Sequence, residues 1–102
     1  MEHMALTETT YYILLSLYEP LHGYGIMQRA AELSGGRVRL AAGTLYGALN
    51  ALVEKGWITL LPGEGRKKEY RLTPRGLEIL KKELARLREL VASGDLVLKE
   101  EA

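Results

Sequence analysis

The sequence contains no cysteine. This absence excludes disulfide bonds, thiolate nucleophiles and cysteine-based metal sites, and it fits a protein that works in the cytoplasm. The two histidines, His3 and His22, have no second metal ligand at a useful spacing. We therefore predict neither a metal site nor a cofactor.

Long apolar runs and an excess of one charge are also missing. No apolar run approaches the roughly 18 residues of a membrane-spanning helix, so we expect no membrane partner. The formal net charge is only +1, which decides nothing about nucleic acid because a local patch matters more than the sum. The chain also lacks a nucleophile–base pair, a carboxylate pair in a glycine-rich loop and a phosphate-binding motif. We therefore predict no enzymatic activity.

What is present suits one small globular domain. The chain has 102 residues, of which 47% are apolar and 26% charged, and these proportions are ordinary for a folded protein. A chain this short buries only a modest core, so oligomerisation is a natural source of further stability.

Apolar periodicity, capping residues and turn residues divide the chain into six elements. The expected helices cover residues 7–18, 25–33, 42–55 and 74–92, and the expected strands cover 58–61 and 68–72. The clearest signal is Thr73-Pro74, a threonine N-cap followed by proline at the first helical position. Ser93-Gly94-Asp95 is expected to end the last helix. This order predicts a mainly α protein with a two-stranded β-hairpin wing, a winged helix-turn-helix.

Helix 42–55 is the expected recognition helix, because the second helix of a helix-turn-helix enters the major groove of DNA. If Leu45, Leu49 and Leu52 face the core, small and polar residues occupy the opposite face. Hydroxyl and amide groups on that face can bond to bases or phosphates. The candidate DNA contacts on this helix are Thr44, Tyr46 and Asn50. The alternatives are that Tyr46 packs at the edge of the core and that Asn50 is simply solvated.

The positive charge that DNA binding requires lies outside this helix, which has no arginine or lysine before Lys55. Three consecutive cations follow the tip of the predicted wing, where they would meet the phosphate backbone or the minor groove. Two arginines precede the recognition helix. The candidate phosphate contacts are Arg66, Lys67, Lys68, Arg37 and Arg39. Glu64 and Glu69 weaken the local field, and an ordinary solvated turn is the alternative.

The last helix carries an apolar seam. Its members, spaced three and four residues apart, are Leu77, Leu80, Leu84, Leu87 and Val91. Such a heptad seam on the terminal helix of a small domain favours a partner helix, although part of it is expected to pack on the first helix of its own chain. Charged residues such as Glu83 and Arg86 are expected on the other faces. The organisation that follows is a DNA-binding domain at 5–73, a dimerisation helix at 74–93 and a flexible tail at 94–102.

Four short motifs occur in order along the chain: LHGYGI at 21–26, GGRVRL at 35–40, GTLY at 43–46 and YRLT at 70–73. Together they resemble the pattern of PadR-like transcriptional regulators over about residues 10–92. The resemblance implies a dimeric repressor that binds double-stranded DNA and has a single C-terminal dimerisation helix. It also implies that the Tyr24 hydroxyl reaches a phosphate from a packed position, whereas His22 shapes the turn. Many family members have proline after the GTLY tyrosine; here Gly47 stands there, at a cost of roughly 1 kcal/mol relative to alanine in a helix.

Two functions are compatible with these features. The first is a homodimeric repressor that binds a pseudo-palindromic operator through helix 42–55 and the wing. The resemblance allows an apolar space at the dimer centre for a small hydrophobic or aromatic effector; we connect Trp57 with it, and core packing is the alternative. The second function is a winged-helix dimer that binds proteins or sequesters ligands without sequence-specific DNA binding. The uncharged recognition helix and the low net charge favour this second function slightly.

Overall fold

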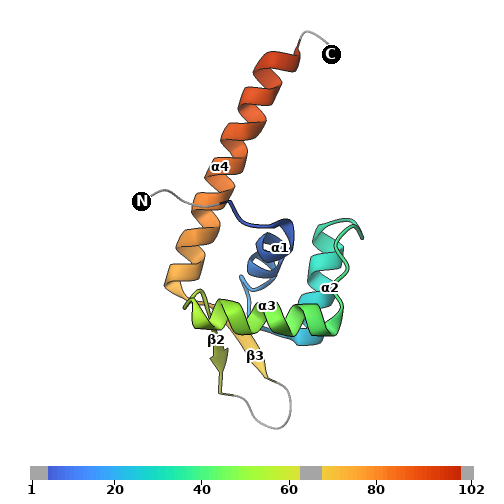
Figure 1. The fold of residues 1–102 in the computed structure, drawn as a ribbon, viewed down its shortest axis with the longest axis vertical. Helices are drawn as coiled ribbons and strands as arrows, with labels where there is room; N and C mark the ends of the chain where they lie inside the picture. Colours follow the sequence, from blue (N-terminus) through green and yellow to red (C-terminus); the bar gives the residue numbers. More distant parts are fainter. Residues whose placement is uncertain (1–4, 63–67, 100–102) are drawn as a thin grey trace.

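The computed structural model describes residues 5–62 and 68–99. Three helices pack around one another above a small sheet, and a long final helix rises from the sheet (Figure 1). Within the described residues, no helix has the length and apolar character needed to cross a membrane. In chain order the elements are α1 (Glu8–Ser16), β1 (Leu21–His22), α2 (Gly23–Leu33), α3 (Ala42–Glu54), β2 (Ile58–Leu61), β3 (Glu69–Leu72) and α4 (Pro74–Leu98).

Threonine side chains cap the N-termini of α1 and α4. The Thr7 side chain accepts a hydrogen bond from the Thr10 backbone N–H at 3.1 Å, and the Thr73 side chain accepts one from the Gly76 N–H at 3.0 Å. Each bond satisfies a backbone donor that has no partner inside the helix. The Thr73 N-cap was predicted from its residue type, so this helix start is encoded locally.

The sheet has three strands rather than the two of the predicted hairpin. Its order is β1-β3-β2 and both pairings are antiparallel. Leu21 pairs with Tyr70, and His22 pairs with Glu69. The expectation that the LHGYG segment is a turn before a helix at Gly25 is therefore wrong: its first two residues form β1, and α2 begins at Gly23. A strand of two residues is too short to show the alternation of apolar and polar residues from which strands are predicted.

Helix α4 is longer than predicted. It continues through Ser93-Gly94-Asp95 to Leu98, so the expected end of the helix near Ala92 is wrong. A glycine ends a helix when it adopts a left-handed conformation. Gly35 and Gly56 do so, with φ of 65° and 78°, and Gly94 does not. The division of the chain into a DNA-binding domain and a dimerisation helix stays a prediction.

The core lies between α1, α2, α3, the sheet and the first turns of α4. Its members are Ile13, Leu14, Leu17, Ile26, Leu45, Leu49, Leu52, Ile58, Tyr70, Ile79 and Leu80. The three leucines expected to face inward from α3 all belong to it. Because this core holds one side of α3 across nearly the whole helix, the opposite side is presented to solvent.

A charged residue is also buried beside this core. Glu83 is only 1% exposed, although the sequence suggested an outer face of the helix. Its carboxylate accepts hydrogen bonds from Arg86 at 2.8 and 2.7 Å and from the Leu6 backbone N–H at 3.1 Å. A buried carboxylate is tolerated when its oxygens are paired in this way. Glu83 thereby fastens the segment before α1 to the middle of α4.

Candidate nucleic-acid interface

The outward face of α3 is open and nearly free of charge. Leu45 and Leu49 are fully buried, whereas Thr44 and Asn50 are exposed. A Cβ atom added at Gly47 would meet no neighbour within 4 Å, and the same holds at Gly43. On this face the polar side chains of Thr44 and Asn50 therefore lie beside glycines. A glycine has no side chain that would keep a binding partner away from the helix. Such a surface allows the close approach that groove contacts require.

The first turns of α2 and α3 carry no side-chain cap. Neither His22 nor Ala41, the two N-cap residues, forms a side-chain hydrogen bond to its helix. The backbone N–H groups of a first turn have no partner within the helix, and together with the helix dipole they favour a negative charge. A phosphate group is one anion that such helix starts accommodate.

Tyr46, in α3, packs against the first residue of α2. Its side chain is 46% exposed, yet its hydroxyl lies so close to Gly23 that a Cβ there would overlap it and would lie 2.8 Å from Cζ. Tyr46 also lies near Tyr70, whose pKa is raised first by burial and then by this neighbour. Tyr46 thus packs on α2 and still presents part of its ring, so the two predicted roles are compatible. Gly23 is a site residue that sequence reasoning missed; its place in the LHGYGI motif was the available signal.

Tyr24 lies one residue further along α2 and is 61% exposed. Its hydroxyl is 3.5 Å from the Gln28 side-chain amide nitrogen. Tyr24 follows Gly23, the residue that Tyr46 contacts, in the first turn of α2. Their predicted contact with DNA stays a prediction.

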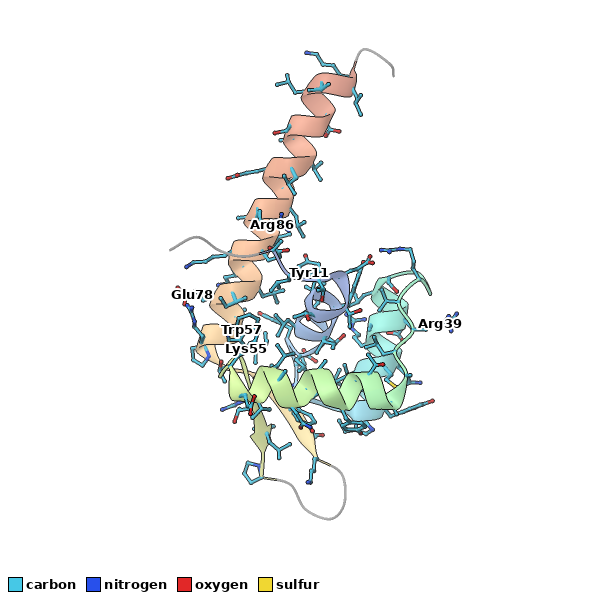
Figure 2. All side chains as sticks on the ribbon, viewed as in Figure 1. Tyr11, Arg39, Lys55, Trp57, Glu78 and Arg86 are labelled. Atoms are coloured by element: carbon cyan, nitrogen blue, oxygen red, sulfur yellow. The ribbon has the colours of Figure 1, made fainter. Side chains whose placement is uncertain are left out.

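The two arginines before α3 differ in their surroundings. Arg37 forms an ion pair with Glu8 in the first turn of α1. This hydrogen-bonded pair lowers the pKa of the Glu8 carboxyl and raises the pKa of the Arg37 guanidinium. Arg39 is exposed and projects outward from the segment between α2 and α3 (Figure 2). Of the two, Arg39 is thus the better placed to contact a phosphate without first breaking an ion pair.

The wing is only partly described. Arg66 and Lys67 lie outside the described residues, and Lys68, the residue immediately before β3, is exposed. The strands that carry the wing pair from Ile58 opposite Leu72 to Leu61 opposite Glu69. The two strands of the hairpin that was predicted to present these cations are therefore paired on both sides of its tip.

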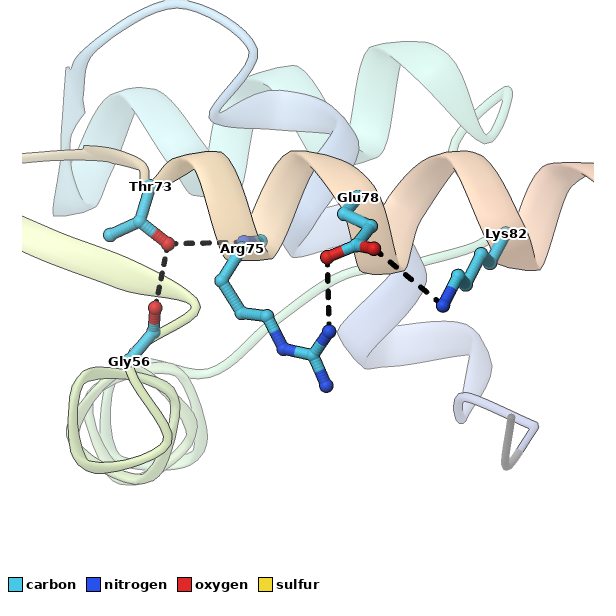
Figure 3. Close-up of polar contacts among 6 residues, drawn as sticks. Gly56, Thr73, Arg75, Glu78 and Lys82 are labelled. Carbon is cyan, nitrogen blue, oxygen red and sulfur yellow. Dashed lines mark hydrogen bonds and ion pairs between the residues drawn. The ribbon is translucent and has the colours of Figure 1, made fainter. Parts of the chain in front are cut away.

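A hydrogen-bonded joint connects the end of α3 to the start of α4 (Figure 3). The Thr73 hydroxyl donates to the Gly56 carbonyl at 2.6 Å, and the Thr73 backbone N–H donates to the Trp57 carbonyl at 3.0 Å. A Cβ added at Gly76 would overlap the same Trp57 carbonyl oxygen. This close contact holds α3 in a defined position relative to α4. Neither Gly56 nor Gly76 was singled out as part of such a joint from the sequence.

Trp57, which was connected with an effector, is half-buried against the core, and the Lys55 ammonium lies 4.8 Å from the centre of its ring. A hollow of about 540 Å³ lies elsewhere, on the sheet beside the base of α4. Trp57 is not among its lining residues, which are Tyr18, Pro20, Thr59, Arg71, Leu72, Thr73, Pro74 and Leu77. An effector site at Trp57 stays a prediction.

Three helices, a small sheet with a hairpin that points away from the core, and an exposed α3 together define a winged helix-turn-helix, the class predicted from the sequence. The chain matches the model of the Transcriptional regulator PadR-like family over residues 12–82 and belongs to that family. This confirms the resemblance drawn from the four sequence motifs. The members of this family are regulators of transcription rather than enzymes.

Two solved structures agree with this assignment. A PadR-like transcription factor from Bacteroides fragilis is 28% identical, with a TM-score of 0.71 over 86% of this chain and 87% of that one. Bacillus subtilis PadR, solved in complex with operator DNA, is 31% identical with a TM-score of 0.63 over 74% of this chain and 45% of that one. An uncharacterised 37.1 kDa protein in transposon TN4556 of Streptomyces fradiae is 44% identical over 64 residues. That match covers 63% of this chain and only 18% of the Streptomyces protein.

Proposed function

We propose that this protein is a homodimeric, cytoplasmic repressor that binds a pseudo-palindromic operator through α3 and the wing. The observation that carries the proposal is the outward face of α3, where Thr44 and Asn50 are exposed beside Gly43 and Gly47. The solved complex of Bacillus subtilis PadR with operator DNA, 31% identical to this chain, supports a DNA partner.

Affinity for the phosphate backbone comes from the wing and from Arg39. Lys68 and Arg39 are exposed, and Arg66 and Lys67 precede Lys68 in the sequence. With Arg37 held by Glu8, a dimer has about 6–8 cations for phosphates, so log K should fall against log salt with a slope of about −5 to −7. A slope near zero would show that the wing does not contact DNA.

The homodimer is supported by apolar side chains that the protomer leaves uncovered. Along the predicted seam, Leu80 is buried in its own domain, but Leu84 is 36% and Val91 61% exposed. Large exposed apolar side chains that cluster on one surface commonly mark a protein interface. A hydrophobic or aromatic effector that relieves repression belongs to the same proposal.

The test is a binding titration against DNA from the region upstream of the gene and against scrambled DNA, each at two salt concentrations. A tenfold or greater preference for the native fragment, with the steep salt dependence above, is expected. Lys67→Ala with Lys68→Ala should weaken binding to both DNAs and lower the slope. The matched control is Lys82→Ala with Lys99→Ala, which removes the same charge from α4 and its C-cap and should leave binding unchanged.

The second candidate function, a protein-interaction or ligand-sequestering dimer, is favoured by the lack of a cation in α3 and by the low net charge. It predicts equal, weak binding to both DNAs by a protein that still has the mass of a dimer. The same titration therefore separates the two functions.

A further inference from the structure

Asn50 carries the only side-chain amide of α3, and it lies on the outward face of that helix. The residue is exposed, and within the part of the chain that the structure describes its amide has no hydrogen-bond partner. An amide presents a carbonyl acceptor and an N–H donor side by side. Figure 1 shows α3, in green, lying across the end of the molecule from which the hairpin extends. The Asn50 amide is therefore available to a partner that approaches this end.

The other residues of α3 limit which bases this face can read. The helix contains no arginine, lysine, glutamine or histidine. Guanine is read in the major groove chiefly by arginine or lysine, which donate to its O6 and N7 atoms, so α3 lacks the usual means of reading guanine. Asparagine matches adenine instead, because its amide donates to N7 and accepts from the N6 amino group. Glu54 is also exposed but lies in the last turn, away from the helix N-terminus that enters a groove first.

The two glycines that precede Asn50 on the same line of the helix explain how so short a side chain reaches a base edge. Gly43 and Gly47 precede it at spacings of four and three residues. A Cβ at either glycine would meet no neighbour within 4 Å, and neither glycine has a positive φ. Glycine destabilises a helix relative to alanine, and here neither packing nor backbone conformation requires it. A helix without side chains at these two positions can approach the bases closely.

We propose that Asn50 reads an adenine in the major groove, while the methyl groups of Thr44 and Ala51 contact a thymine methyl group in an adjacent base pair. Thr44 and Ala51 are both exposed, and their spacing of seven residues places them on the same side of the outward face. Alanine and threonine read thymine through such apolar contacts. The inference rests on the proposed function and deepens it, because it names A·T pairs as the part of the operator that α3 selects.

This arrangement separates specificity from affinity. Arg39 and Lys68 lie outside α3 and contact phosphates, which are the same in every sequence. Asn50→Ala should therefore weaken binding to the preferred site by about 5- to 150-fold per half-site and leave binding to scrambled DNA unchanged. Alanine is the better helix former, so the variant should melt no lower than the unsubstituted chain. The wing variants differ, because they should weaken binding to both DNAs.

The test lets the full chain and Asn50→Ala each select their preferred sites from a library of random DNA duplexes. The full chain should select an adenine in each half-site, and Asn50→Ala should lose the preference at that position alone. In one half-site, 7-deazaadenine, which lacks the N7 acceptor, should weaken binding of the full chain by about fivefold and leave Asn50→Ala unaffected. Uracil, which lacks the methyl group of thymine, should weaken binding by about threefold at the adjacent pair. The matched control is Gln28→Ala, which removes an exposed amide from α2 and should keep every base preference.

Other results overturn the inference. If Asn50→Ala selected the same site with the same preferences, Asn50 would read no base. A guanine at the position that depends on Asn50, or an unchanged affinity with 7-deazaadenine or with uracil, would show that the contacts differ from those proposed. These three results leave the proposed repressor intact, because the full chain still selects a sequence. A selection that enriches no sequence would instead remove the inference and the proposed function together.

Discussion

The joint between α3 and α4 makes a sharp prediction about Gly76. This residue lies in the first turn of α4, where its Cα is so close to the end of α3 that no side chain fits. A Cβ at position 76 would overlap the carbonyl oxygen of Trp57 and would lie 2.8 Å from its carbonyl carbon and 3.2 Å from its Cα. All three atoms belong to the backbone, so no rotamer change can relieve the overlap. Gly76→Ala must therefore move α4 away from the Gly56–Trp57 turn.

The size of the effect follows from three contributions. Overpacking a well-filled site typically costs about 1–3 kcal/mol. Moving α4 also weakens the hydrogen bond from the Thr73 N–H to the Trp57 carbonyl, a bond of a kind that contributes about 0.5–1.5 kcal/mol. Against these losses, alanine gains up to about 1 kcal/mol over glycine in a helix. The free energy of unfolding should fall by about 2 kcal/mol, equivalent to a melting temperature lower by about 10 °C in a domain of this size.

The assay is urea unfolding followed by circular dichroism, at one protein concentration because dimerisation would affect apparent stability. The matched control is Gly47→Ala, another glycine within a helix, whose added Cβ meets nothing within 4 Å. It should raise the free energy of unfolding by up to about 1 kcal/mol. If Gly76→Ala proved as stable as Gly47→Ala, the close contact between α4 and the Trp57 carbonyl would be refuted.

Two further predictions concern ion pairs. Glu83→Gln should lower the free energy of unfolding by about 3 kcal/mol at pH 7, because it removes one partner of a buried pair; urea unfolding checks this, and an effect no larger than that of the exposed Glu89→Gln would contradict it. Arg37→Gln should return the pKa of Glu8 toward its ordinary value, because Arg37 is the main cause of its lowering. A lowered carboxyl pKa means that the pair stabilises the fold above the ordinary pKa and that this stability is lost as the pH falls through the lowered one. An NMR titration of the Glu8 carboxyl measures the shift, and an unchanged pKa in Arg37→Gln would exclude the ion pair in solution.

Features encoded by neighbouring residues were predictable. The Thr73-Pro74 start of α4 and the inward stripe of α3 follow from capping chemistry and from the helical repeat, which involve residues a few positions apart. The hairpin was also found, because each of its strands alternates within its own four residues. The four family motifs indicated the class of protein, because each motif is a short run of adjacent residues.

Features that depend on distant residues were not predictable. The strand β1 exists because Leu21 lies beside Tyr70, nearly fifty positions along the chain. The burial of Glu83 depends on the Leu6 N–H, which belongs to the other end of the chain. The contact between Tyr46 and Gly23 likewise required α2 and α3 to be packed. In each case the partner is distant in the sequence, so a local pattern cannot identify it.

The amino-acid sequence alone therefore determined the order of the elements, the winged helix-turn-helix class, the family and the polar face of α3, since these depend on local periodicity and on motifs. The tertiary structure alone decided that Arg37 is held by Glu8, that Thr73 and Gly76 join α3 to α4, and that the apolar face of α4 continues uncovered to Leu98. These depend on which surfaces meet and which remain exposed, and that is settled only when the whole chain has packed.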